Sequence, residues 1–247
     1  ATEIYTVQGT GARPAQAQIG VALPSPSNMQ IMDIPILRDA DNDPGLYVAL
    51  AGFSTGWPGA VLFVGADDAS LTSRGGVTQG TILGTADSAL GAWTSQIMDQ
   101  TNSVLVTIGP GTLASATRDQ VLDNAVNTAL LGNEIIGFTT ATLISGSQYQ
   151  LSGLIRGLRG TEAQNGTHAI GERFVLLSFA GMLRPLFDLT ELNANRQFRP
   201  ITTGQLLSSN TSTPAQDTGV GLKPFNPVNL HRSTDASNNI TLTCNYV

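Results

Sequence analysis

Charge, cysteine and histidine are all scarce in this sequence. Only 12% of the 247 residues are charged, and the net charge is −6, with the basic residues scattered singly. Binding to a phosphate backbone needs clustered lysines and arginines, so we expect no nucleic-acid partner. The single cysteine, Cys244, excludes a disulfide framework and a cysteine-based zinc site. Two histidines, His168 and His231, leave few ligands for transition metals.

Long hydrophobic runs are also missing. The longest, such as residues 59–65 and 174–177, fall far short of the ~18 residues of a bilayer-crossing helix, so we expect no membrane span. Hydrophobic residues still make up 41% of the chain, which argues against disorder. The sequence is rich in turn formers, with 27 glycines and 12 prolines.

The apolar segments that are present are short, rich in β-branched residues and separated by Gly/Pro turns. Regular spacing of this kind predicts a mainly β fold of barrel-like or sandwich-like domains, with one or two short helices. The predicted strands are residues 16–23, 31–37, 46–51, 60–64, 77–83, 104–108, 134–144, 148–154, 173–179 and 197–201.

Helical spacing occurs in one segment, residues 115–131, which predicts a short helix near 117–131. Thr117 and Gln120 have the spacing of a capping box, and Gly132 is the expected stop. A second candidate helix at 183–192 is interrupted by Pro185.

Changes in punctuation predict four segments. We expect a β-rich domain at 1–95, a second at 96–207, and a linker at 208–223 that contains almost no core-forming residues. Two further strands within 224–247 have nothing to pair with except each other, and two strands form a marginal hairpin at best. We therefore expect the chain to be a piece of a longer polypeptide.

Three motifs suggest chemistry that their surroundings do not support. Ser54 lies in a G-x-S-x-G pattern, but the following Trp-Pro-Gly and β-like run cannot form the helix that a nucleophile elbow requires. Asp39, Asp41 and Asp43 alternate as in a calcium loop, yet the later glycine and glutamate are missing. An Asx-rich turn is favoured there, and a cation site remains the alternative. The adjacent acids of residues 67–68 point to opposite faces of a strand and cannot act on one bond.

The most distinctive segment is L-I-R-G-L-R-G-T-E at 154–162. Arg156 and Arg159, separated by glycine, have the donors to clamp a carboxylate or phosphate, or to tie a loop to Glu134, Glu162 or Glu172. We favour the structural role, and we predict no catalytic, cofactor-binding or metal-ligating residue. The protein is therefore not expected to be an enzyme.

The same motifs carry a family resemblance. In order along the chain, residues 31–45, 56–63, 134–138, 149–162 and 221–230 resemble bacteriophage tail hub and tip proteins of the gene-transfer-agent and phage-tail 3 type. The resemblance implies a structural baseplate hub protein in the virion, at the distal end of the tail, linking the tail tube to receptor-binding parts. It implies other tail-tip proteins and copies of the same chain as partners, often as a trimer. It also implies a fibronectin-III-like domain after the K-P-x-x-P-V segment, with Cys244 near the place of a core aromatic.

Two other functions stay open. A carbohydrate-binding module that contacts a host surface glycan would stack sugars on Trp57, Trp93, Tyr47 or Tyr149. A glycoside or peptidoglycan hydrolase fragment would need Ser54 as nucleophile or two converging carboxylates, from acids that are dispersed in sequence. In the structural interpretation, the loops at 38–45 and 156–162 fix the geometry of the domains.

Overall fold

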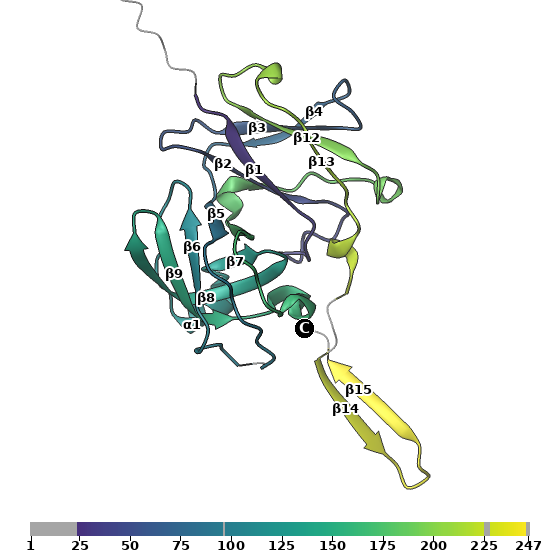
Figure 1. Ribbon diagram of the computed structural model, residues 1–247. Coiled ribbons are helices and arrows are strands. Elements are labelled where there is room, and N and C mark those ends of the chain that lie inside the picture. Colours follow the sequence, from purple (N-terminus) through teal and green to yellow (C-terminus); the bar gives the residue numbers. More distant parts are fainter. Residues whose placement is uncertain (1–23, 96, 225–227, 246–247) are drawn as a thin grey trace, which may run out of the picture.

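A computed structural model describes residues 24–95, 97–224 and 228–245. The fold is mainly β, as predicted, and contains one closed barrel, two larger sheets and a two-stranded sheet (Figure 1). The strand expected at 16–23 lies outside the described residues.

Six antiparallel strands close the barrel in the order β10-β5-β6-β9-β8-β7. Their bounds are β5 Leu83–Ala86, β6 Val104–Ile108, β7 Thr128–Leu131, β8 Glu134–Ser145, β9 Gln148–Ile155 and β10 Arg173–Leu176. Strict alternation sends one set of side chains inward. Val106, Phe138 and Phe174 belong to the interior core, whereas Ile135 and Val175 belong to a second core outside the barrel.

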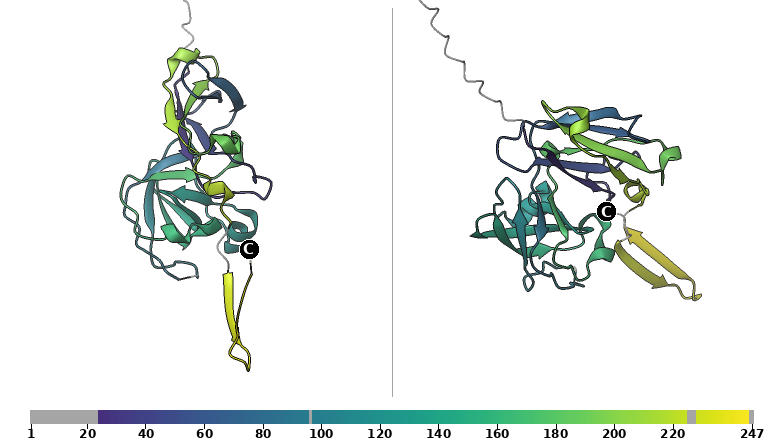
Figure 2. Two further views of the ribbon diagram at one scale, coloured as in Figure 1. Left: turned by 90° about the vertical axis from the view of Figure 1, so that its right-hand side faces the viewer. Right: turned by 45° about the horizontal axis from the view of Figure 1, so that its top comes forward.

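Two sheets pack beside the barrel as further layers (Figures 1 and 2). The three-stranded sheet has the order β1-β2-β11, formed by Ser27–Met32, Tyr47–Gly52 and Met182–Leu183. The four-stranded sheet has the order β13-β12-β3-β4, formed by Thr213–Ala215, Arg196–Thr202, Ala60–Gly65 and Thr72–Val77.

The middle layer is buried on both faces. Every residue of β2 is buried, and alternate side chains enter different cores. Tyr47 and Ala49 pack toward the barrel, while Val48 and Leu50 pack toward the four-stranded sheet. Two-sided burial explains why this strand reads as a continuous apolar run in the sequence.

Strand pairing crosses the boundary predicted at residue 95. β5 precedes that boundary and closes a barrel made otherwise of later strands, while β11 and β12 follow it and pair with β2 and β3. The punctuation of the sequence reveals turns, but long-range pairing decides which strands share a sheet. The predicted linker at 208–223 likewise contains β13, which pairs with β12.

Among the described residues there is one α-helix, α1, which spans Arg118–Asn124 and begins at the predicted capping box of Thr117 and Gln120. It ends earlier than the predicted stop at Gly132, because Ala125 adopts a left-handed conformation and residues from Thr128 onward are recruited into β7. α1 packs against β8, and Gly137 in β8 permits this close packing because a Cβ there would lie 2.5 Å from Val121 Cγ1.

The other helical segments in the described part of the chain are single 3₁₀ turns. They are η1 Leu158–Gly160, η2 Glu162–Gln164, η3 Phe179–Gly181, η4 Leu189–Glu191, η5 Leu207–Ser209 and η6 Val220–Leu222. The second candidate helix at 183–192 is therefore wrong: only η4 forms there, after Pro185.

At the C-terminal side, β14 (Val228–Thr234) pairs with β15 (Ile240–Asn245) and with no other described strand, as expected for the two strands predicted there. The side chain of Cys244 lies outside the described part of the structure. Among the described residues, no helix has the length and apolarity needed to cross a bilayer.

Candidate functional site

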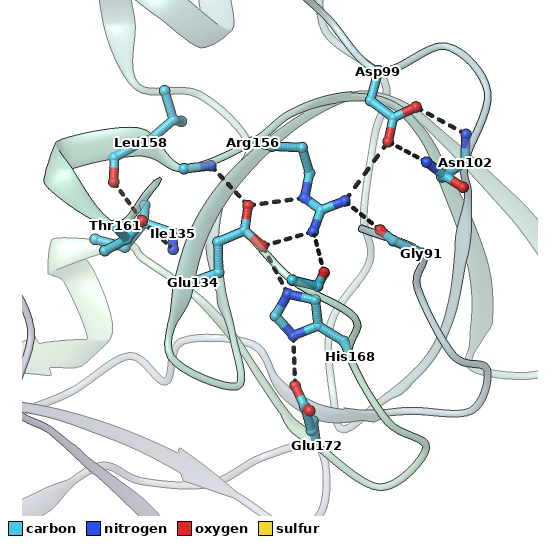
Figure 3. A network of polar contacts seen from close by, with 12 residues as sticks. Gly91, Asp99, Asn102, Glu134, Ile135, Arg156, Leu158, Thr161, His168 and Glu172 are labelled. Carbon is cyan, nitrogen blue, oxygen red and sulfur yellow. Dashed lines mark hydrogen bonds and ion pairs between the residues drawn. The ribbon is translucent and has the colours of Figure 1, made fainter. Parts of the chain in front are cut away.

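The distinctive arginine motif leads to a buried ion pair at one end of the barrel (Figure 3). Arg156 follows β9 directly and Glu134 begins β8. The guanidinium donates from Nε to Glu134 Oε1 and from Nη2 to Glu134 Oε2, both at 2.8 Å, and both side chains are fully buried. Of the three acids that the sequence offered to this motif, the structure pairs Arg156 with Glu134.

Further donors complete the environment of the Glu134 carboxylate. The backbone N–H of Gly157 donates to Oε1 at 2.7 Å, and His168 Nε2 lies 2.7 Å from Oε2. A carboxylate has about four lone-pair sites, and these contacts fill all four. No lone pair of Glu134 is left to accept a proton from a substrate.

His168 joins two carboxylates. Its Nε2 faces Glu134 and its Nδ1 lies 2.7 Å from Glu172 Oε2. Both acceptors are carboxylates, so both ring nitrogens must carry hydrogen for both bonds to form, which requires the imidazolium. The hydrogen bond to Glu134 is the main cause that raises the pKa of His168. Burial alone would lower this pKa, and the bond to Glu172 raises it further.

The two glutamates shift in the opposite direction. Burial by itself would raise the pKa of Glu134, but the hydrogen bonds from His168 and Arg156 outweigh it, so the pKa lies below its ordinary value. Burial opposes the same change at Glu172, where the bonds from the Ala169 N–H and His168 lower the pKa.

The other end of Arg156 holds the loop between β5 and β6. Nη1 donates to Gly91 O at 2.9 Å and lies 3.6 Å from Asp99 Oδ2. The buried Asp99 carboxylate in turn accepts bonds from the backbone of Thr101 and from the backbone and side chain of Asn102. Arg156 therefore connects this loop, β8 and the segment around His168 to one another, so its role in the fold is structural.

Arg159, three residues later, lies in a different environment. It is exposed, and its backbone has a φ of 57°, in the left-handed region. It borders two adjoining hollows. One, of about 440 Å³, is also lined by Asp33, Thr218 and Lys223. The other, of about 100 Å³, is mainly apolar and is lined by residues that include Leu122 and Phe179.

The loop at 38–45 is also tied internally. Asp41 accepts two bonds from the Arg38 guanidinium and one from the Tyr47 hydroxyl at 2.6 Å. Burial and the bond to Asp41 raise the pKa of Tyr47 to about 12. Arg38 also stacks on Phe179, and Arg184 reaches the backbone carbonyl of Asp43. Asp41 is thus a structural anchor, and the loop connects β2 to the segment that includes η3 and β11.

The other motif residues are not brought together. Ser54 lies in the exposed loop between β2 and β3, with no helix after it in that described loop. Asp67 caps its own turn through Ser70, whereas Asp68 pairs with Arg199. In the described part of the chain, no group of three or more acidic, histidine or cysteine residues is placed to hold a metal ion.

Of the four candidate sugar-stacking aromatics, Tyr47 and Tyr149 are buried. Trp57 is half-buried, lies against Gly52 and donates to Ser27 Oγ. Trp93 lines a hollow of about 650 Å³ together with Gln100 and Arg118, and also a neighbouring one of about 260 Å³.

Sequence reasoning missed His168 and Asp99 as members of the network. Neither lies in a recognisable motif, and each is positioned by an isolated backbone bridge to a distant residue, His168 to Leu90 and Asp99 to Leu154. Nothing in the local sequence signals those long-range pairs.

Comparison with protein families gives one match. Residues 81–175 match the family described as Rcc01698-like, C-terminal, over a little more than a third of the chain. The matched segment starts two residues before β5 and ends inside β10, so it coincides with the barrel. Comparison with curated proteins finds no match.

Proposed function

We propose that this protein is a structural component of a phage or phage-like tail tip or baseplate hub. In this role it sits at the distal end of the tail and links the tail tube to receptor-binding parts. Its partners are other tail-tip proteins and copies of itself, as a trimer in the full assembly. The ordered series of motifs shared with tail hub proteins is the starting point of the proposal.

The main support for the proposal is that Arg156, in the distinctive motif at 154–162, forms contacts inside the protein. Arg156 and Glu134 spend their hydrogen-bonding capacity on each other and on neighbouring segments of the chain. A buried, satisfied network of this kind holds loops in a fixed arrangement and offers no open group for chemistry. This favours a scaffold over a hydrolase built on the same residues.

A second observation points to neighbours. The end of the β8–β9 hairpin extends beyond the buried part of the barrel, and Leu143 and Ile144 at that end are 55% and 51% exposed. The pairing with β9 shifts register between Leu143 and Ser145, so the hairpin end is irregular there, and both apolar side chains remain exposed to solvent. Exposed apolar surface of this kind marks contact sites on proteins that assemble.

The test is to localise the protein in purified particles. Antibodies raised against the 247-residue chain should label the distal tail end in immunogold electron microscopy, and particles made without the gene should lack that structure or fail to adsorb. Labelling of the capsid or of no particle at all would overturn the proposal.

A hairpin variant sharpens this test. Leu143→Thr combined with Ile144→Thr keeps β propensity and should leave the melting temperature unchanged, but it should lower incorporation into particles. Ile170→Thr, at a residue that is 70% exposed away from the hairpin, is the matched control and should incorporate normally. Normal incorporation of the double variant would show that the hairpin end is not a contact required for assembly.

A second candidate function, binding of a host surface glycan, is favoured by the position of Trp93. Its ring borders the 650 Å³ hollow while its Nε1 donates to Ile97 O at 2.9 Å, so the indole is held in place beside open space. Aromatic faces in such settings stack on apolar faces of ligands.

A glycan array decides this second function. Binding by the wild-type chain that is lost in Trp93→Ala and kept in Phe53→Ala, at an exposed aromatic elsewhere, would support it. An array with no bound glycan, or equal binding by both variants, would count against it.

A further inference from the structure

We propose that the two hollows beside Arg159 form a docking groove for a short polypeptide segment of a partner, one that carries a carboxylate next to an apolar side chain. We call this surface the Arg159 groove, and its defining residues are Asp33, Leu122, Arg159, Phe179 and Lys223. The inference rests on the proposed function only for the source of the segment, a neighbouring tail-tip protein.

The backbone of Arg159 is the first reason. A non-glycine residue in the left-handed region costs roughly 1–2 kcal/mol, a cost that glycine avoids. The neighbours Gly157 and Gly160 adopt left-handed conformations as glycines, with φ of 64° and 80°, but position 159 carries an arginine at φ 57°. Arg159 is the one charged residue among the described non-glycine residues with positive φ, which directs attention to what its side chain meets.

The surroundings of that side chain are the second reason. Within residues 24–95, 97–224 and 228–245, no hydrogen bond or ion pair is formed by the Arg159 guanidinium, in contrast to Arg156. Its five donors are therefore available to a ligand, and their planar fork suits a carboxylate.

Charge favours an anion on the polar side of the groove. Arg159 and Lys223 both line the larger hollow, against the single carboxylate of Asp33. Asp33 Oδ2 accepts bonds from the backbone N–H of Thr218 at 2.9 Å and from its hydroxyl at 2.6 Å, whereas Oδ1 is buried without a hydrogen-bond partner, so this carboxylate offsets one of the two positive charges. The excess positive charge in this hollow is complementary to an acidic group, although the chain as a whole carries −6.

The adjoining hollow defines the second half of the ligand. It is lined by apolar side chains, and Leu122 and Phe179 on its rim remain 43% and 42% exposed. A dry apolar cavity of about 150 Å³ accommodates a benzene molecule, so the 100 Å³ here suits one aliphatic side chain. Because Arg159 borders both hollows, the carboxylate and the aliphatic group must lie close together on the ligand, as in neighbouring residues of a peptide.

A peptide titration tests the groove on the intact chain. The probe is the blocked peptide acetyl-Gly-Leu-Asp-Gly-amide, added to ¹⁵N-labelled protein, and the readout is the change in amide chemical shifts. We expect saturable shifts confined to the groove. Blocked peptides with Asn in place of Asp, or with Ser in place of Leu, should bind about tenfold more weakly, because each removes one half of the match. Sodium acetate alone should bind far more weakly than the Leu-Asp peptide.

Variants separate binding from folding. Arg159→Gly removes the guanidinium and relieves the backbone, so it should bind the Leu-Asp peptide about tenfold or more weakly while melting no lower than wild type. Arg74→Ala, at an exposed arginine of β4, is the matched control and should bind normally.

Three outcomes would overturn the groove: no saturable shifts with the Leu-Asp peptide, equal binding by Arg159→Gly, or binding of acetate as tight as that of the peptide. The last would identify a small-anion site instead. None of these outcomes bears on where the protein sits in a particle, so the groove and the proposed function fail independently.

Discussion

Arg156 and Arg159 are three residues apart in one motif, yet they belong to opposite kinds of environment. The Arg156 side chain is fully buried and its donors are used by Glu134, Gly91 and Gly166. Arg159 is exposed on a strained backbone and borders open hollows. Between the two side chains the backbone is left-handed at Gly157 and again at Arg159 itself, so the regular direction of β9 does not continue from one arginine to the other.

The comparison separates two uses of the same residue type. A buried arginine that is surrounded by acceptors stabilises a fold, and removing it leaves charges uncompensated. An exposed arginine without an internal acceptor contributes little to stability and is free to bind another molecule. Substitutions at the two positions should therefore differ in size, in sign and in the property that changes.

The largest expected effect is at the buried position. Arg156→Ala strands the carboxylate of Glu134 in a dry environment and should lower the free energy of unfolding by about 3–5 kcal/mol. Urea denaturation monitored by circular dichroism measures this. Arg156→Lys, which keeps the charge but loses the two-point contact, should fall between wild type and alanine. A loss below about 1 kcal/mol in Arg156→Ala would show that the network is not what holds these loops.

The network also predicts a pH range of maximal stability. The folded-state pKa of His168 is raised above 6.5, so its contribution is complete below pH 6.5 and is lost as the pH rises through the folded value. The pKa values of Glu134 and Glu172 are lowered below 4.5, so their contributions are complete above pH 4.5 and are lost as the pH falls through the folded values. Each unit of difference between folded and unfolded pKa is worth about 1.4 kcal/mol.

Thermal melting across pH should accordingly give its highest midpoint between about 4.5 and 6.5, the ordinary values for glutamate and histidine. His168→Gln should remove the decline on the alkaline side of that range. A wild-type protein that becomes more stable between pH 6.5 and 8 would contradict the imidazolium bridge.

A smaller effect is expected on the groove side. Thr117→Ala removes the N-cap of α1, and the loss of such a cap costs about 1 kcal/mol. Since Val121 and Leu122 of α1 line the apolar hollow, amide hydrogen exchange should increase around α1. Exchange in the loop that contains Asp99 should stay as in wild type. Equal acceleration in both regions would mean that they are not independent.

The smallest effect has the opposite sign. Arg159→Gly should raise the free energy of unfolding by about 0.5 kcal/mol, because relief of the left-handed strain outweighs the larger conformational entropy that glycine loses on folding. Gly157→Ala is the counterpart in the same turn and should destabilise, since its Cβ would lie 2.9 Å from the backbone of Glu162. Destabilisation by Arg159→Gly would reveal a structural role for the arginine.

Local signals in the sequence predicted a good part of this molecule. β6 has the predicted bounds, the capping box of Thr117 starts α1, and Arg156 forms one of the ion pairs considered for it. Signals that depend on distant pairing were missed. The predicted helix covers β7 because the apolar residues of β7 also fit helical spacing. His168 lies 34 residues from Glu134 in the sequence, and no local pattern predicts their contact.

The central strand β2 has a consequence for how the sequence can change. Val48 and Ala49 are neighbours in the chain, but their side chains pack into different cores on opposite faces of one sheet. A substitution at an odd-numbered position of β2 can therefore be compensated by residues around the barrel. One at an even-numbered position can be compensated by residues of the four-stranded sheet. Because β2 supplies side chains to both cores, a change in its backbone position affects the packing of both halves of the protein at once.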